Sequence, residues 1–554
     1  MERLHPMIEA TESDSLLLAE QEHTPGAPDA ERAARPLPTW FVIGLVAAVV
    51  WCATAGAVGI ALLVAGWYAA SVVGGAATLA SFAAATAAWR GLGRRAHADH
   101  RAALASVVLV VAFFAFASAF HSEHLLIDRD PAGYINTGRS IARSHELRPK
   151  IQRGAFIFTS DKKPYARYQP NFFPMLPVLL ALGWSVGGDV GMLLVGPLLG
   201  ALGLLACYAL ASRVLGPRGG LLAPAFLMIG PLQLWFARDA YSELVVQVVV
   251  LGGLLLFLEA RAHARWGIAL LSGGLVASSA LARIDALAIV VGGLALVGAE
   301  WVHCDSDAMP VQARRVVAGF GCGLVGGTLV ALATTYYVAH GYIVSLGAEW
   351  GALVGACALT IVGVIAVVVI HRMRPGFGRW FAQREYPFAA IVAASAGVFA
   401  WAYVWRPDPA SDLAFVAPGR PISLALRNST NAWHFSYSLR WFSSYFGLVA
   451  IVVGFVGFVV LASRARRGDS AAATVFLVVV PVTVMYIARP SISPDQPWAM
   501  RRYLPIVIPG LAIAVAVALA TGWRAAGSTR GSRARATARA GLVAVALLVA
   551  VPSA

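Results

Sequence analysis

Residues 40–89 read WFVIGLVAAVVWCATAGAVGIALLVAGWYAASVVGGAATLASFAAATAAW and contain no Asp, Glu, Lys or Arg. An α-helix needs about 20 apolar residues to cross a bilayer, so this stretch is long enough for two membrane-spanning helices. Gly66 and Trp67 lie near its centre and predict the turn between the two helices. Uncharged runs of this kind decide the fold, because they recur along nearly the whole chain.

The remaining apolar runs predict further membrane spans. They fall near residues 103–120, 189–212, 219–236, 243–260, 266–282, 284–302, 316–339, 343–370, 388–405, 445–462, 471–488, 504–523 and 541–554. Residues 173–187 are shorter and contain Pro174 and Pro177, so we expect an interfacial or re-entrant helix there. The sequence therefore predicts an all-α polytopic membrane protein with about 13–15 transmembrane helices.

The composition supports a protein that lives in the lipid bilayer. The 554 residues are 59% hydrophobic and 13% charged, with a mean hydropathy of +0.71, whereas soluble domains carry about 25% charged residues. The net charge of +15 comes from arginines spread over many short loops. No basic face is interleaved with aromatic residues, so we expect no nucleic-acid partner. No phosphate-binding loop of the GxxxxGK[ST] type occurs, so we expect no nucleotide cofactor.

The distribution of arginine predicts the orientation. With the N-terminus in the cytoplasm, the short cytoplasmic loops contain 22 arginines. The outer side contains 18 basic residues, but 13 of them lie in two long loops, where the positive-inside bias is weaker. Two long loops, 121–172 and 406–441, then face outward. Residues 1–38 contain eight acids and scattered Pro, without apolar periodicity, and predict a disordered cytoplasmic tail.

The first long outer loop contains the strongest candidates for chemistry. Asp128 and Asp130 flank Arg129 at a membrane boundary. Such a pair of carboxylates can act as a general base or hold a divalent metal. A solvated turn is the alternative, because Asp-Arg-Asp-Pro is common in loops.

Four segments resemble the GT-C superfamily of integral-membrane glycosyltransferases. The acidic pair followed by Tyr134 resembles its first outer loop, and residues 168–177 resemble its Pro-rich approach to the next helices. Residues 208–216 resemble an inner turn, and 237–243 resemble the second outer loop, where an arginine precedes an acid. The resemblance covers about 103–523, a GT-C-like catalytic module. It leaves two extra N-terminal helices (39–102), and a basic cytoplasmic loop with a terminal apolar segment (524–554).

The resemblance implies a transferase of the actinobacterial type in the bacterial plasma membrane, with its active site extracytoplasmic. The donor would be a polyprenyl-phosphate sugar and the acceptor a cell-envelope glycan, lipid or protein, with inversion of the anomeric carbon. Asp130 matches the catalytic base, and Asp128 is the second choice. Glu243 and Tyr134 would orient the acceptor. Asp128, Asp130 and Glu243 would hold a metal, Mg or Mn, if the reaction needs one.

Arginines near the predicted outer boundary are candidates for the donor phosphate. These are Arg238, Arg283, Arg501 and Arg502, since Arg forms bidentate contacts with phosphate. For Arg283 the alternative is a structural ion pair with Asp285, and for Arg501 and Arg502 it is anchoring in the interface. Trp498 and Trp433 could stack on sugar rings or belong to the aromatic belt.

A transporter or flippase of lipid-linked sugars is the competing class of function. Transporters commonly contain internal repeats and charges near the middle of the membrane. The sequence has no readable repeat, and its acids gather at one boundary. Both features favour the enzyme.

Overall fold

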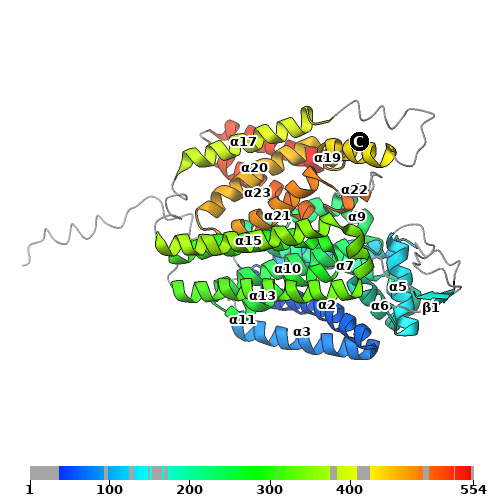
Figure 1. The fold of residues 1–554 in the computed structure, drawn as a ribbon. Coiled ribbons are helices and arrows are strands. Elements are labelled where there is room, and N and C mark those ends of the chain that lie inside the picture. The colour runs from blue at the N-terminus through cyan, green and yellow to red at the C-terminus, as the bar shows by residue number, and fades with distance from the viewer. Residues whose placement is uncertain are drawn as a thin grey trace, which may run out of the picture.

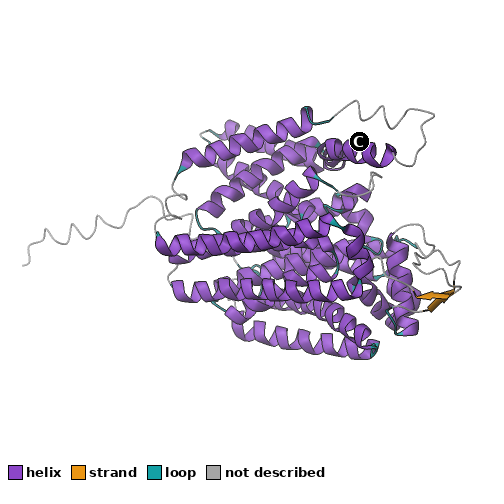
Figure 2. Cartoon of the chain, viewed as in Figure 1, coloured by secondary structure: helices purple, strands orange, loops and turns teal. Residues whose placement is uncertain are grey.

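The structure is a computed structural model of a bundle of helices, seen in Figures 1 and 2. It describes residues 36–92, 98–123, 130–147, 150–152, 165–167, 173–306, 309–374, 384–407, 425–490, 498–529 and 531–550. Thirteen helices of this described part are long and apolar enough to cross a membrane. The chain is therefore a multi-pass membrane protein, as its hydropathy predicts.

The described elements follow one another along the chain in this order. The first half contains α2 (Thr39–Ala65), α3 (Ala70–Leu92), α4 (His100–Ala119), α5 (Asp130–Ser144), β1 (Lys150–Gln152), β2 (Tyr165–Arg167), α6 (Met175–Leu193), α7 (Val195–Gly220), α8 (Leu222–Ile229), α9 (Pro231–Ala237), α10 (Ser242–Ala262), α11 (Trp266–Ser278), η2 (Ser279–Leu281), η3 (Ile284–Ala286), α12 (Leu287–His303) and η4 (Cys304–Ser306). The second half contains α13 (Pro310–Val338), α14 (His340–Leu346), α15 (Ala348–Met373), α17 (Glu385–Val404), α19 (Ala425–Phe446), α20 (Leu448–Arg466), α21 (Ser470–Ala488), α22 (Trp498–Arg501), α23 (Val507–Gly527) and α24 (Ser532–Ala550).

Several expected spans differ from the helices observed. The run 219–236 forms two short helices, α8 and α9, because Gly230 is extended and Pro231 starts a new helix. The run 541–554 lies partly in α24. This helix is not among the thirteen, because its first half contains three arginines. The run 266–282 is a helix too short to be counted with them.

Helix α6 covers the segment predicted to be interfacial or re-entrant. Its length and composition place it among the thirteen candidate spans. However, Gly187 and Gly188 leave helical geometry, and Gly188 has a positive φ of 60°. This break limits the first straight part of α6 to residues before Gly187.

The described chain also contains one β-hairpin, which hydropathy did not predict. Strands β1 and β2 are antiparallel and pair Lys150 with Arg167. They lie in the loop 121–172, beside α5 in Figure 2. Each strand has only three residues, so the alternation of side chains is too brief to read from sequence.

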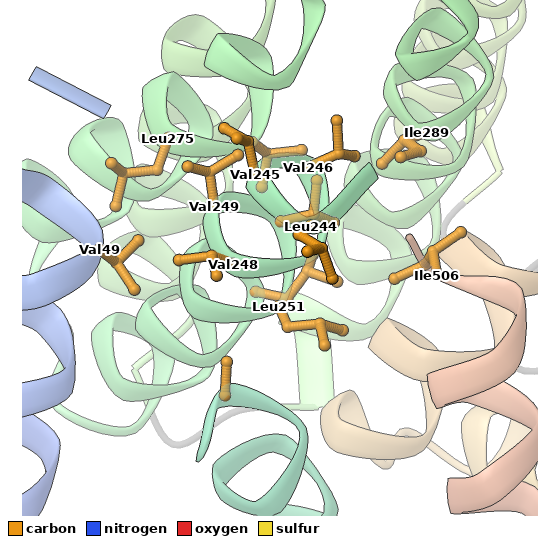
Figure 3. Close-up of a cluster of buried hydrophobic side chains, with 14 of the residues drawn as sticks. Val49, Leu244, Val245, Val246, Val248, Val249, Leu251, Leu275, Ile289 and Ile506 are labelled. Carbon is orange, nitrogen blue, oxygen red and sulfur yellow. The ribbon is translucent and has the colours of Figure 1, made fainter. Parts of the chain in front are cut away.

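Helix α10 forms the centre of the bundle. Figure 3 shows its Leu244, Val245, Val246, Val248, Val249 and Leu251 packed among Val49 of α2, Leu275 of α11, Ile289 of α12 and Ile506. The most apolar 18-residue stretch of α10 is completely buried. A helix that is apolar all round belongs inside a bundle, so α10 holds its first residues, Ser242 and Glu243, in the protein interior.

Helices α15 and α17 lie at the periphery. Only 6% of the most apolar 18-residue stretch of each is buried in the described protein, so most of their side chains face away from the bundle. Close packing occurs elsewhere, for example where α11 meets α13. There a side chain at Gly323 would overlap the carbonyl oxygen of Leu270, which explains why a residue without Cβ occupies this position.

Candidate active site

Residues from five separate parts of the chain meet at one end of the bundle, the right-hand end in Figure 1, where α5, α9 and α22 lie. They come from the N-terminal ends of α5 and α10, from the turn around η3, from the C-terminal end of α21 and from α22 and the residue after it. Together they form the arginine cluster, which consists of Asp130, Tyr134, Ser242, Glu243, Arg283, Asp285, Tyr486, Arg501 and Arg502.

Arg283 is the most enclosed arginine of the cluster. It lies in extended backbone between η2 and η3. Its Nε and Nη2 donate to the two carboxylate oxygens of Asp285, at 2.9 and 2.7 Å. Its Nη1 donates to Glu243 and to Ser242 Oγ, the latter at 3.2 Å. This bidentate geometry fixes the plane of the guanidinium.

Asp285 also organises a second arginine. Its Oδ2 accepts hydrogen bonds from Arg502 Nη1 at 2.7 Å and from the Tyr486 hydroxyl at 2.6 Å. Tyr486 in turn accepts, through its backbone oxygen, a hydrogen bond from the Tyr503 hydroxyl at 3.1 Å. The sequence analysis gives an ion pair with Asp285 as the alternative to a phosphate-binding role for Arg283. This ion pair is present, and it is part of a larger network.

Arg501 lies between the two carboxylates that the resemblance singles out. Its Nη1 contacts Asp130 Oδ2, and its Nε lies 3.5 Å from Glu243 Oε1. The Asp130 side chain is 31% exposed, whereas that of Glu243 is 0% exposed. Asp130 is thus the acid of this pair that solvent or a substrate can reach.

Tyr134 connects α5 to the start of α10. It is buried, and its hydroxyl lies 3.0 Å from Ser242 Oγ. Burial raises the pKa of Tyr134, so the phenol is neutral near pH 7 and can donate a hydrogen bond. The N-terminal ends of α5 and α10 are held together by this contact and by Arg501.

The charges of the cluster balance. Three arginines face three carboxylates, and every one of these six groups has an oppositely charged partner. An anionic ligand that binds to one of these arginines therefore competes with the carboxylate that already contacts it.

The other predicted site residues lie elsewhere or outside the described residues. Arg238 donates to the carbonyl oxygen of Phe120, at the end of α4, and its own carbonyl accepts from Ser122. Asp128 lies outside the described residues. Trp433 belongs to α19 and Trp498 begins α22, but their side chains are outside the described part. Roles for these residues stay predictions.

The predicted metal ligands do not form a metal site in the part of the chain that is described. No group of three His, Cys, Asp or Glu side chains there is arranged to hold an ion. Asp130 and Glu243 contact arginine, which a metal ion would have to displace. Mg or Mn binding is therefore a prediction that depends on Asp128.

The sequence analysis does not identify two members of the cluster and gives a third only as an ion-pair partner. Ser242 and Tyr486 were not singled out, and Asp285 was considered only as a partner of Arg283. Tyr486 lies inside an apolar run, where a tyrosine normally indicates packing or the interface. Asp285 and Tyr486 are 201 residues apart, and no pattern in a single sequence indicates such a contact.

One solved structure supports the architecture. The structure is similar to that of the oligosaccharyltransferase of Archaeoglobus fulgidus in its apo form, with a TM-score of 0.51 and 15% identity over 81% of this chain and 55% of that chain. This chain thus spans about half the length of the archaeal protein. A match to ArnT of Cupriavidus metallidurans, in a structure with bound undecaprenyl phosphate, has a TM-score of 0.28 and 14% identity, covering 76% of this chain and 79% of that chain.

The sequence by itself has no match of this kind. No sequence model of a protein family matches it, and no curated protein does. The relation is therefore one of fold. With thirteen candidate spans and a buried central α10, the described chain is a helical membrane bundle whose fold is similar to that of the archaeal oligosaccharyltransferase.

Proposed function

We propose that the protein is a GT-C glycosyltransferase. It moves a sugar from a polyprenyl-phosphate donor to a cell-envelope glycan, lipid or protein acceptor, with inversion, on the outer face of the plasma membrane. The observation that carries the proposal is the position of Arg501, which joins the reachable carboxylate of Asp130 to the buried carboxylate of Glu243. The proposed base, Asp130, and a proposed phosphate-binding residue, Arg501, are therefore in direct contact.

Asp130 is the base in this proposal. It accepts the proton of the acceptor hydroxyl while that oxygen attacks the anomeric carbon. The bond from the anomeric carbon to the phosphate oxygen breaks, and polyprenyl phosphate leaves with the bonding electrons. The partial exposure of Asp130, at the first residue of α5, supports this assignment over Glu243.

Arg501 and Arg502 bind the donor phosphate and stabilise the charge that develops on it as it leaves. Arg501 contacts an Asp130 carboxylate oxygen in the structure, so that oxygen is occupied while Arg501 is its partner. The donor phosphate replaces Asp130 on Arg501 and so frees the base. Proton transfer is thereby linked to the presence of donor.

Glu243 and Asp285 are positioning residues. Glu243 is fully buried and contacts both Arg283 and Arg501. Asp285 holds Arg283 and Arg502. Their burial supports a role in aiming the arginines, since a site must fix its charged groups before the ligand arrives.

The proposal is tested by a transfer assay. The purified protein in lipid nanodiscs receives a radiolabelled polyprenyl-phosphate sugar and a mixture of envelope acceptors. We expect free polyprenyl phosphate and a labelled glycoside to form in equal amounts. Movement of the intact donor between the leaflets of reconstituted vesicles, without any cleavage, would instead identify the competing function, a transporter or flippase.

A further inference from the structure

A second group of arginines lines a cavity at the opposite end of the bundle. The cavity has a volume of about 380 Å³, and its lining includes Arg213 of α7, Arg261 of α10, His303 of α12, and Arg467, Gly468 and Ser470 around the start of α21. Sites for small molecules typically have volumes of ~300–1,000 Å³. The cavity is therefore large enough for a polar headgroup.

This cavity is separate from the arginine cluster. Helix α10 begins at the cluster with Glu243 and reaches the cavity with Arg261, 18 residues later, which corresponds to about 27 Å along a helix. Helix α21 runs the other way, from Ser470 at the cavity to Tyr486 at the cluster. The two groups thus lie at opposite ends of the same helices.

Two of the cavity arginines form ion pairs with buried acids. Arg261 Nε donates to Glu300 Oε2 at 2.9 Å, and Ser470 Oγ donates to the same oxygen at 2.9 Å. Arg213 Nη1 lies 3.6 Å from Glu259 Oε1. A guanidinium has five N–H groups, and the ion pair with a buried acid fixes how each of these two side chains is oriented.

The N-terminus of α21 adds backbone donors to the lining. Asp469 caps this helix by accepting from the amide of Ala472 at 3.0 Å. Ser470 and Ala471, the first two residues of the helix, line the cavity. Their amides have no partner inside the helix, and a helix N-terminus favours an anion.

Tryptophans place the cavity at the depth of lipid headgroups. Trp266 is exposed at the start of α11, and Trp301 lies in the last turn of α12, two residues before His303. Tryptophan concentrates at the boundary between membrane and water. Basic pockets between transmembrane helices at this level bind the headgroups of anionic lipids.

We propose that this cavity binds the phosphate of an anionic membrane lipid, from the leaflet opposite the arginine cluster. Arg213, Arg261, Arg467 and the first amides of α21 contact the phosphate oxygens. In the predicted orientation this leaflet is the cytoplasmic one. The site does not depend on the proposed transferase activity, since none of these residues belongs to the arginine cluster.

The test measures binding of soluble short-chain lipids to the full-length protein in a neutral detergent. The probes are dihexanoyl phosphatidylglycerol, dihexanoyl phosphatidylcholine and inorganic phosphate. We expect the anionic lipid to bind at least about tenfold more tightly than the zwitterionic lipid, because charge-assisted hydrogen bonds to the arginines contribute that much each. Equal binding of both lipids would overturn the proposal. Binding of inorganic phosphate as tight as that of the anionic lipid would overturn the lipid as its source.

Variants locate the binding. Arg467→Ala removes a lining arginine that is 67% exposed, so the fold should tolerate it. Arg213→Gln removes a charge and keeps an N–H donor near Glu259. We expect each to weaken binding of the anionic lipid about tenfold or more. The matched control is Arg315→Ala, an exposed arginine at the start of α13 that does not line the cavity. Unchanged binding in both lining variants, or an equal loss in the control, would contradict the assignment.

Discussion

Arg501 contacts Asp130 at the start of α5 and lies 3.5 Å from Glu243 at the start of α10, so one guanidinium joins the N-terminal ends of two helices. Both helix ends carry partial positive charge, which favours the two carboxylates and opposes the arginine. An anion that reaches Arg501 therefore competes with Asp130 for it. The proposed link between donor binding and the release of the base depends on this exchange.

Removing the arginines that we propose bind the donor phosphate should weaken donor binding. Arg501→Ala and Arg502→Ala each delete a charge-assisted hydrogen bond of ~1.5–3 kcal/mol, which corresponds to about 10–150-fold in donor affinity or transfer. Arg501→Lys should restore part of the loss, because Lys keeps the charge without the planar fork. Isothermal titration with donor and initial transfer rates measure both effects.

The control for this series is Arg489→Ala, at the same end of the bundle. Arg489 is 66% exposed and lies 3.6 Å from Glu349, so its loss should leave donor binding unchanged. If a folded Arg501→Ala, Arg502→Ala double variant binds and transfers like the wild type, the phosphate is held elsewhere.

Replacing Asp285 by Asn should destabilise the fold more than replacing an exposed acid by its amide does. The change removes the negative charge that faces Arg283 and Arg502 in a buried setting. Breaking a buried ion pair by removing one partner costs ~3–5 kcal/mol. Asp189→Asn is the control, because Asp189 is 48% exposed in its pair with Arg139, and surface pairs contribute ~0–1 kcal/mol. Unfolding in SDS monitored by tryptophan fluorescence compares the two, and equal midpoints would refute a structural role for Asp285.

The orientation makes a prediction about accessibility. Single cysteines introduced into residues 121–172 or 406–441 should react with an impermeant thiol reagent in intact cells, and cysteines in 371–387 or 524–540 should not. The background is low, because Cys52, Cys207, Cys304 and Cys357 are buried and Cys322 can be replaced by Ala. Labelling of 524–540 with protection of 121–172 would reverse the orientation and move the proposed site to the cytoplasmic face.

Hydropathy predicts most of the fold because the bilayer imposes length and apolarity on each span. It fails where a local break interrupts an apolar run. Gly230 and Pro231 divide one expected span into α8 and α9, and Gly187 and Gly188 break α6. Hydropathy averaged over a window does not reveal that one residue, Gly230, is extended. Pro231 does indicate a helix start, because proline lacks a backbone N–H.

The candidate site is predictable only where its charges are rare. Arg283 attracts notice because charged residues are rare inside long apolar stretches, and Arg501 because it is next to a second arginine, Arg502, at the predicted outer boundary. Ser242 and Tyr486 are ordinary within apolar helices, and their partners are distant in sequence. Which arginine meets which acid depends on how α5, α10, α21 and α22 pack together, and this packing has no signal in the sequence of any one of them.

Asp130→Asn tests the central claim most directly. The substitution keeps the size of the side chain and removes the basic carboxylate that accepts the proton. A general base contributes ~10²–10⁴-fold to a rate. Donor binding should persist, because Arg501 and Arg502 are unchanged. Asp128→Asn is the companion variant, and a larger loss there would shift the base by two residues. We predict that Asp130→Asn binds a labelled polyprenyl-phosphate sugar with at least wild-type affinity and loses transfer at least a hundredfold. Transfer above a tenth of the wild-type rate would show that Asp130 is not the base.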